Sequence, residues 1–465
     1  MFDKVLIANR GEIAARILRT CRRLGIPTVA VYSDADAGAP HVRLADEAVR
    51  LGPAPVRESY LAVDALVRAI RETGAAAVHP GYGLLSEQRG FAEAVADAGA
   101  VFIGPPPAAL ERLGDKLSAR ALARGVGVEP PPGSEGPLDP ADADALRREA
   151  ERVGYPVLLK AAGGGGGIGM QIVRDPAQLS VAARSCADRG RAAFGDERIY
   201  LERWVDRPRH IEVQVLCDAH GNAVALGERE CSVQRRHQKV LEESPSPASM
   251  FHGPEGERRR HKLWDDALAV VRAAGYVNAG TVEFVADAGG RLWFLEVNAR
   301  LQVEHPVTEC VTGLDLVEWQ LRVAAGEALP AELLEPSRSG HAVEVRLYAE
   351  DPAKGFVPQP GRVAALGWPA GEGVRVDAGV EAGSEITSFY DPMIAKLIAH
   401  GPDRATALER LRSALAETTL ALEGPKGPRA TNLAWLRELL EATEVIEGSY
   451  DTGIVERLVA AKKSR

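Results

Sequence analysis

The sequence lacks three features that would place the protein in particular classes. No apolar run reaches the roughly 18 residues that a membrane-spanning helix needs, and no apolar signal core follows Met1. Lys and Arg number 56 against 65 Asp and Glu, so the net charge of −9 argues against a uniformly basic nucleic-acid surface. The cysteines are scattered without a CxxC pair, which indicates reduced thiols: Cys21, Cys186, Cys217, Cys231 and Cys310. We therefore expect a cytoplasmic protein that binds neither nucleic acid nor membrane.

Two nucleotide-binding motifs are also missing. The first strand-like run is not followed by GxGxxG, so a dinucleotide site is not indicated. The glycine-rich stretch does not match the Walker pattern GxxxxGK[ST], so a P-loop fold is not supported. The 465 residues contain no internal repeat or low-complexity segment, and at roughly 150 residues per domain they predict about three domains.

The N-terminal part alternates strand-like and helical patterns. Apolar runs at 3–8 and 28–32 flank a helical spacing at 11–24, and the alternation continues beyond 77–83. This βαβ order predicts a parallel sheet. We predict a doubly wound, Rossmann-like α/β domain at 1–113.

The rest of the chain divides at changes of composition. Proline and glycine gather at 130–140, as in a linker, and strand-like runs then flank a stretch of glycines. We predict a central domain at 114–330 with a mobile glycine-rich lid at about 132–204, a C-terminal mixed α/β domain at 331–446, and a C-terminal tail at 447–465.

A predicted hairpin brings two acidic side chains together. Gly289-Gly290, flanked by strand-like runs, is a signal for a two-residue hairpin loop. Counting outward from that loop sets Glu283 directly opposite Glu296. Like charges in that position repel, and a cation between them would reverse the sign of the interaction. Carboxylate oxygens in a nucleotide site suggest Mg²⁺.

Strand alternation extends this polar face. Asn298 lies two residues beyond Glu296 and so on the same side of the strand, and Arg300, Gln302 and Glu304 continue the period. The alternative is a solvated outer face, which nothing in the segment forbids.

A run of glycines at 163–167 follows Lys160 at the end of an apolar strand. Consecutive glycines cost backbone entropy, and bare N–H groups that cradle a phosphate are the usual reason for them. A flexible surface turn is the alternative, and the preceding lysine weighs against it. The segment 229–239 is strongly basic, which fits either an anion site or solvated charge.

Several segments together resemble one family. They are KVLIANRGEIAARI, HPGYGLLSE, YPVLLKAAGGGGG, ERECSVQRRHQKVLEE, EVNARLQVEHPVTE, GHAVEVRLYAEDP and YDPMIAKLI. The chain resembles biotin carboxylases, members of the ATP-grasp superfamily, over roughly 1–446. The resemblance implies a pre-ATP-grasp domain, a central ATP-grasp domain and a C-terminal biotin carboxylase domain.

The resemblance also implies an activity. Such a ligase forms a C–N bond by carboxylating biotin with bicarbonate through carboxyphosphate, using ATP and two Mg²⁺ ions that Mn²⁺ can replace. This would be the first half-reaction of an acetyl-CoA or other acyl-CoA carboxylase, as in fatty acid biosynthesis, and the family suggests a homodimer. None of Met1, Met170, Met250 and Met393 adjoins a lysine, as a biotin attachment site would require. We therefore expect biotin on a separate carrier protein and the carboxyltransferase on another chain.

Individual roles are implied by the resemblance position by position. The residues expected to bind ATP are Lys116, Lys160, Gly165, Gly166, Gly167, Glu202, Trp204, Val205, His210, Gln234 and His237. The residues expected to hold Mg²⁺ are Glu283, Glu296 and Asn298. The residues expected at the bicarbonate and biotin site are Lys239, Arg300, Gln302, Val303, Glu304 as general base, Arg346 for the biotin enolate, and Tyr82.

One position departs from the family, and two rival hypotheses stay open. The family's glycine loop is usually followed by Arg or Lys, where this chain has Ile168, so phosphate contact by the lid is in doubt. One rival is another ATP-grasp carboxylate ligase, although a carbamoyl-phosphate synthetase would show an internal duplication. The other is a catalytically silent nucleotide-binding homologue.

Overall fold

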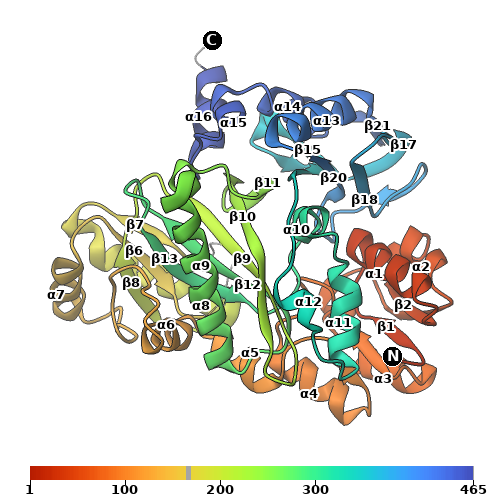
Figure 1. Cartoon of the computed structure of the whole chain (residues 1–465), viewed down its shortest axis with the longest axis horizontal. Coiled ribbons are helices and arrows are strands. Elements are labelled where there is room, and N and C mark those ends of the chain that lie inside the picture. The colour runs from red at the N-terminus through yellow and green to blue at the C-terminus, as the bar shows by residue number, and fades with distance from the viewer. Residues whose placement is uncertain (164–168, 464–465) are drawn as a thin grey trace.

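The computed structural model describes residues 1–163 and 169–463. Within these ranges no helix combines the length and the apolar character that crossing a membrane requires. Figure 1 shows the N-terminal region in red and orange, the central region in green, and the C-terminal region in blue.

The N-terminal region forms a parallel sheet, as predicted. Its five strands run in the order β3-β2-β1-β4-β5, and every neighbouring pair is parallel. Val5 and Ile7 pack on one face while Leu6 packs on the other, so β1 is buried on both sides. The elements are β1 (Val5–Ile7), α1 (Gly11–Arg23), β2 (Thr28–Ser33), α2 (Pro40–Leu44), β3 (Glu47–Gly52), α3 (Val63–Thr73), β4 (Ala77–His79), α4 (Arg89–Asp97) and β5 (Val101–Phe102).

A single antiparallel sheet runs through the middle of the molecule. Its eight strands lie in the order β13-β12-β9-β10-β11-β14-β20-β18. The last three strands come from residues beyond the predicted boundary at 330, so the C-terminal region continues the central sheet. The strands are β9 (Arg209–Cys217), β10 (Ala223–Arg235), β11 (Gln238–Ser244), β12 (Asn278–Ala286), β13 (Leu292–Asn298), β14 (His341–Tyr348), β18 (Val374–Ala378) and β20 (Met393–Gly401).

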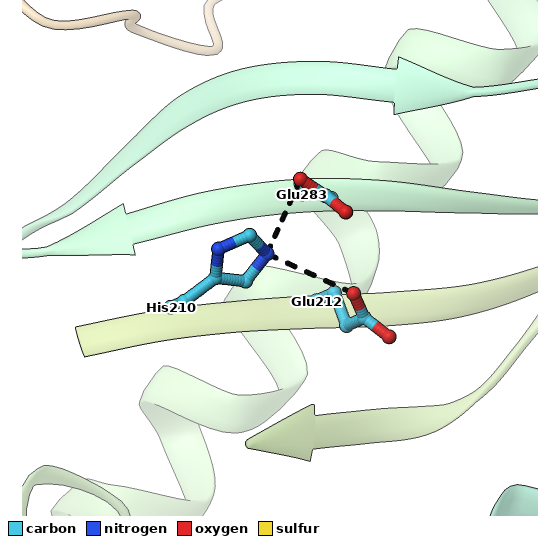
Figure 2. Close-up of side chains that lie close together, drawn as sticks. All are labelled: His210, Glu212 and Glu283. Carbon is cyan, nitrogen blue, oxygen red and sulfur yellow. Dashed lines mark ion pairs between the residues drawn. The ribbon is translucent and has the colours of Figure 1, made fainter. Parts of the chain in front are cut away.

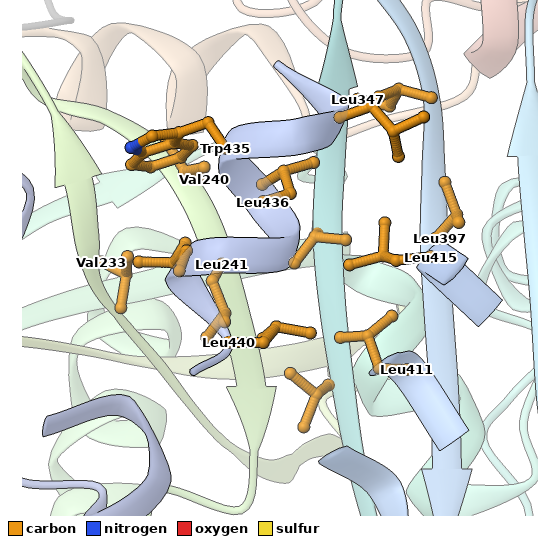
Figure 3. Packing of buried hydrophobic residues seen from close by; sticks show 14 of the residues in the cluster. Val233, Val240, Leu241, Leu347, Leu397, Leu411, Leu415, Trp435, Leu436 and Leu440 are labelled. Carbon is orange, nitrogen blue, oxygen red and sulfur yellow. The ribbon is translucent and has the colours of Figure 1, made fainter. Parts of the chain in front are cut away.

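Apolar side chains cover this sheet through helices at both ends. α9 (Gly253–Ala274) packs beside β9 and β10, where Ile211, Val213 and Val215 belong to the same buried cluster as Leu263. At the other end, α13 (Arg404–Glu417) and α14 (Leu433–Leu439) close a core around Leu347. Figure 3 shows that core, with Trp435, Leu436 and Leu440 facing Val240, Leu241 and Leu397.

The predicted lid segment is a small layer of its own. Its three strands run in the order β7-β6-β8, with α7 and α8 packed against them, and α7 lies at the edge of the molecule in Figure 1. Gly165, Gly166, Gly167 and Ile168 lie outside the described residues. The elements are α7 (Ala143–Val153), β6 (Val157–Ala161), β7 (Gln171–Val173), α8 (Leu179–Phe194) and β8 (Ile199–Arg203).

The segment set apart as a C-terminal tail is folded against the central sheet over 447–463. Tyr450 and Ile454 are buried, and the chain ends in α16 (Ile454–Lys463), which packs beside β10. The remaining helices and strands are α5 (Pro107–Gly114), α6 (Lys116–Gly125), α10 (His305–Thr312), α11 (Leu316–Ala324), α12 (Ala331–Leu334), α15 (Thr443–Glu447), β15 (Glu350–Asp351), β16 (Val357–Pro358), β17 (Gly361–Gly367), β19 (Glu385–Ile386), β21 (Thr419–Gly424) and β22 (Gly427–Arg429).

Candidate active site

One cavity of about 640 Å³ gathers most of the residues singled out by the sequence. The lid strands, the central sheet and the start of α16 all contribute to its lining. The predicted residues that line it are Lys116, Lys160, Glu202, Trp204, Val205, His210, Gln234, His237, Lys239, Glu283, Glu296, Asn298, Arg300, Gln302, Val303, Glu304 and Arg346.

The hairpin β12–β13 pairs Glu283 with Glu296, as predicted, but by a different route. Asp287 pairs with Arg291, so the loop has three residues rather than the two expected from Gly289-Gly290. The register then shifts by one residue at Leu295, because Phe284 faces Phe294 while Glu283 faces Glu296. This β-bulge offsets the extra loop residue and restores the pairing of the two acids.

Cations of the protein neutralise both acids of this pair. Lys116 forms an ion pair with Glu296, while His210 Nε2 lies 3.2 Å and Lys239 Nζ 3.0 Å from Glu283. Burial alone would raise the pKa of Glu283, but Lys239 and His210 outweigh it and hold the pKa well below its usual range. The Glu283 carboxylate is therefore ionised and available to a bound cation.

His210, Glu212 and Glu283 form a compact group on β9 and β12 that could hold a metal ion (Figure 2). His210 Nε2 lies 3.8 Å from Glu212, beyond its contact with Glu283. Burial opposes protonation of His210, yet the neighbouring Glu283 raises the pKa of its imidazole to about 9. His210 therefore adds a positive charge beside Glu283.

Lys239 lies at the centre of the buried charges. Its Nζ contacts Glu212 at 2.5 Å, Glu304 at 2.6 Å and Glu283 at 3.0 Å. Burial would lower the pKa of this ammonium, but Glu212 and Glu283 raise it well above its usual value. The cavity therefore keeps a permanent positive charge next to Glu304.

Glu304 lies between two cations at the first turn of α10. Its Oε1 accepts from Lys239, and its Oε2 accepts from Arg346 Nη2 at 3.0 Å. Burial raises its pKa, but Lys239, Arg346 and Arg229 together outweigh burial, and the pKa stays below its usual value. A second carboxylate also holds Arg346 in place, since its Nε donates to Glu242 Oε1 at 2.6 Å. Glu304 is thus an ionised acceptor, as a general base requires.

The segment after Asn298 does not continue as a strand. β13 ends at Asn298, and residues 299–304 form a loop that leads into α10. Arg300 and Gln302 still line the cavity, and Gln302 Nε2 donates to Glu283 Oε1 at 2.9 Å. The strict alternation expected through Glu304 is therefore wrong beyond Asn298, although the side chains reach the same cavity.

The other end of the cavity contains the residues expected to bind a nucleotide. Lys160 and Arg120 both form ion pairs with the buried carboxylate of Glu202. Trp204 and Val205 follow on the same lining, and the backbone N–H of Trp204 donates to the Pro156 carbonyl.

A strained turn also reaches this end of the cavity. Arg236 and His237 form the two-residue loop between β10 and β11, with φ of 48° and 67°. Such left-handed conformations are costly for residues other than glycine and concentrate at functional sites. Gln234, just before the turn, donates from Nε2 to the Cys231 carbonyl at 2.8 Å.

Tyr82 lies outside this lining. Its hydroxyl contacts Glu12, whose Oε1 lies 3.3 Å from Lys396 Nζ. Lys396 in turn donates to the Val303 carbonyl at 2.8 Å. Tyr82 therefore connects to the site through two further residues.

Comparisons with known proteins follow the same division of the chain. Family models match the biotin carboxylase N-terminal domain at 1–110, the ATP-binding domain of carbamoyl-phosphate synthase L chain at 115–332, and the biotin carboxylase C-terminal domain at 344–457. The biotin carboxylase of Halalkalibacterium halodurans is 48% identical over 465 residues, covering 100% of both chains. The chain belongs to the biotin carboxylase family. It is therefore an ATP-dependent ligase with the ATP-grasp fold predicted from the sequence.

Two further relatives are similar to nearly the whole of this chain. The propionyl-CoA carboxylase alpha chain of Homo sapiens is 48% identical over 453 residues, and this chain spans 60% of its length. The biotin carboxylase domain of Hydrogenobacter thermophilus 2-oxoglutarate carboxylase superposes with a TM-score of 0.91 at 41% identity, covering 98% of each chain. That structure is a dimer in complex with MgADP, ADP and bicarbonate.

The biotin carboxylase site contains buried residues that the sequence analysis missed. Arg229 is fully buried and donates to Glu212 at 2.5 Å, Gln214 at 2.7 Å and Gln302 at 3.1 Å. A signal was present, because Glu212 and Gln214 alternate with apolar residues along β9, and a polar row on a buried strand needs partners. Glu87 and Glu242 were also missed; they contact Arg300 and Arg346.

Proposed function

We propose that the chain carboxylates biotin with bicarbonate and ATP, giving N-carboxybiotin, ADP and phosphate. The observation that carries this proposal is the position of Glu304 between Lys239 and Arg346, in the same cavity as the paired acids Glu283 and Glu296. The bicarbonate and MgADP in the Hydrogenobacter thermophilus relative support the same assignment.

The nucleotide and its metal would occupy the end of the cavity with the paired acids and the lid. Glu283, Glu296 and Asn298 would hold Mg²⁺, since carboxylate and amide oxygens are the ligands this ion prefers. The fit is supported by the two carboxylates, which face each other across β12 and β13 and line the same cavity. Mg²⁺ would neutralise charge on the transferred phosphoryl group.

ATP contacts are proposed for a second group of side chains and for the glycine run. Lys116 pairs with Glu296, His210 with Glu283 and Lys160 with Glu202. We propose that bound MgATP replaces part of these carboxylate contacts, so that the three cations face the phosphates. The other residues proposed to contact ATP are Gly165, Gly166, Gly167, Glu202, Trp204, Val205, Gln234 and His237.

The chemistry then follows from the charges around Glu304. Glu304 takes the bicarbonate proton, and the freed oxygen attacks the γ-phosphorus, which displaces ADP and forms carboxyphosphate. Carboxyphosphate separates into CO₂ and phosphate, and the phosphate removes the ureido N–H proton of biotin. The biotin nitrogen then attacks CO₂. Lys239, Arg300, Gln302 and the Val303 backbone would bind bicarbonate, and Arg346 would stabilise the enolate oxygen of biotin.

The partners are part of the same proposal. Biotin would arrive on a carrier protein, and a carboxyltransferase on another chain would pass the carboxyl group to acetyl-CoA or another acyl-CoA. The propionyl-CoA carboxylase relative supports an acyl-CoA acceptor, and the dimeric Hydrogenobacter thermophilus domain supports a homodimer. Tyr82 is proposed to act near biotin only through its contacts with Glu12 and Lys396.

The test is the substrate dependence of ADP formation. The wild-type chain should release ADP from MgATP at a rate that rises when bicarbonate and free biotin are both added. Arg346→Ala should lower biotin carboxylation by about 10²–10³, as expected for the loss of one charge-stabilising donor. A wild-type rate in that variant would contradict the role of Arg346. MgATP binding without bicarbonate-dependent ADP release would instead indicate a silent homologue.

A further inference from the structure

The loop at 299–304 carries Arg300, Gln302 and Glu304 but belongs to no sheet. Its six residues follow the last residue of β13, where regular strand pairing stops. A loop outside a sheet loses the hydrogen bonds that would fix its backbone, so other groups must set its conformation. Side chains from the two flanking domains supply these contacts.

Glu87 supplies the contact at the start of the loop. It follows β4 in the N-terminal domain, and its Oε1 accepts the Ala299 N–H at 2.8 Å. Its Oε2 accepts from Arg300 Nε at 2.9 Å. One carboxylate thus fixes both the backbone and the guanidinium at this point.

The remaining contacts of Arg300 determine which of its N–H groups are free. Nη2 donates to Asn298 Oδ1 at 3.1 Å, and Nη1 donates to the Leu301 carbonyl at 3.2 Å. A guanidinium has five N–H groups, so one on each terminal nitrogen has no partner among the described residues. These free donors can bind a small anion.

Lys396 supplies the contact near the end of the loop. This fully buried residue of β20 in the C-terminal region donates from Nζ to the Val303 carbonyl at 2.8 Å. Its ammonium is neutralised by Glu12 of α1, which lies 3.3 Å away and also contacts the Tyr82 hydroxyl. Glu12, Tyr82 and Glu87 all follow β1 or β4, the strands between which the order of the N-terminal sheet reverses. Ligand sites form at such a switch point.

We infer that Glu87 and Lys396 are positioning residues for bicarbonate: they fix the 299–304 loop from the two flanking domains without touching the reacting atoms. This inference rests on the proposed function, which assigns bicarbonate to Arg300 and Gln302. It gives a role to the segments HPGYGLLSE and YDPMIAKLI, whose residues lie largely outside the cavity lining.

The first test is Glu87→Gln, which keeps the shape of the side chain and removes its charge. The KM for bicarbonate should rise about tenfold, as expected for the loss of one charge-assisted hydrogen bond. The KM for ATP should stay within twofold of the wild-type value. The matched control is Glu93→Gln on α4. Within the described part of the chain Glu93 pairs only with Arg89, at the surface, so the change should alter neither constant.

A double-mutant cycle separates positioning from general damage. If Glu87 acts through Arg300, Glu87→Gln should raise the KM for bicarbonate much less in an Arg300→Lys background. Independent effects that multiply would overturn the inference. So would an equal rise in the KM values of ATP and bicarbonate, because a purely structural role predicts that result.

The second test addresses Lys396 without leaving a buried carboxylate unpaired. Lys396→Met is combined with Glu12→Gln, and the KM for bicarbonate should again rise several-fold with the KM for ATP unchanged. A wild-type KM in both this variant and Glu87→Gln would overturn the inference while leaving the proposed function intact. If the wild-type chain itself lacks bicarbonate-dependent ADP formation, the proposed function fails first.

Discussion

The N-terminal sheet and the central sheet of this chain use their interiors differently. In the N-terminal sheet, Val5 and Ile7 pack on one side and Leu6 on the other, so both faces are apolar. In the central sheet, β9 places Ile211 and Val213 in an apolar cluster but turns the fully buried Glu212 to the opposite face. Of these two sheets, as far as the described residues show, the central one alone buries ion pairs between its strands.

This difference separates a scaffold from a site. Buried ion pairs rarely stabilise a fold, because the cost of removing two charges from water is close to or larger than their attraction. A face that nevertheless combines Glu212, Arg229, Lys239 and Glu304 is explained by chemistry rather than by stability. Substitutions in the two sheets should therefore have different consequences.

The largest effect is expected for Glu304→Gln. Loss of a general base lowers turnover by about 10²–10⁴. The fold should persist, because Lys239 keeps Glu212 and Glu283 as partners, and Arg346 keeps Glu242. Steady-state ADP formation together with the thermal unfolding midpoint checks both points. Turnover within tenfold of the wild-type value would show that another group takes the proton.

A smaller effect is expected when the interiors of the two sheets are truncated in parallel. Arg229→Met leaves Glu212 with one of its two strong partners and should lower the free energy of unfolding by about 3–5 kcal/mol. Leu6→Ala in the N-terminal sheet should cost about 2–5 kcal/mol through its cavity.

The two variants should differ in activity. Turnover per folded molecule should fall only for Arg229→Met, because Arg229 also contacts Gln302. Urea unfolding and activity at matched folded fractions measure both quantities. Equal turnover in the two variants would remove the distinction between scaffold and site.

The smallest effect is a difference in the pH range of acid destabilisation. Burial lowers the pKa of His79, on β4 of the N-terminal sheet, from 6.5 to about 3. Below pH 6.5 His79 is protonated in the unfolded chain, but in the folded chain it is protonated only below about pH 3. The free energy of unfolding therefore falls as the pH drops from 6.5 to about 3. For Glu243, on β11 of the central sheet, burial raises the pKa, but His341 and Arg404 outweigh it and lower it to about 2. Its stabilising contribution is present above pH 4.5 and is lost between pH 4.5 and about 2.

Two variants distinguish the pH range in which His79 lowers stability from the range in which Glu243 does. Between pH 6.5 and 4.5, His79→Gln should lose less stability than the wild-type chain, and Glu243→Gln should follow the wild type. Below pH 4.5, Glu243→Gln should lose less stability than the wild type. Urea midpoints measured at several pH values check this order, and identical profiles for all three proteins would contradict both assignments.

The sequence predicted the parts of the molecule that local patterns determine. The alternation at 3–32 was sufficient for the parallel sheet. The hairpin signal predicted the pairing of Glu283 and Glu296, but with a loop one residue too short, which the bulge at Leu295 offsets. The contacts of Glu87 and Lys396 were beyond reach, because they join residues more than 90 positions apart through tertiary packing. The folded segment at 447–463 was also missed, since the burial of Tyr450 depends on Glu243 and Arg209.

The bulge at Leu295 has a consequence for how this hairpin tolerates changes in length. The longer loop and the bulge compensate each other, so they separate the loop end of the hairpin from the end that carries Glu283 and Glu296. Gain or loss of one residue near Gly290 could then be absorbed by the irregularity, whereas the same event between Leu295 and Asn298 would rotate an acid away from its partner. Insertions and deletions should therefore accumulate on the distal side of that residue as the lineage diverges.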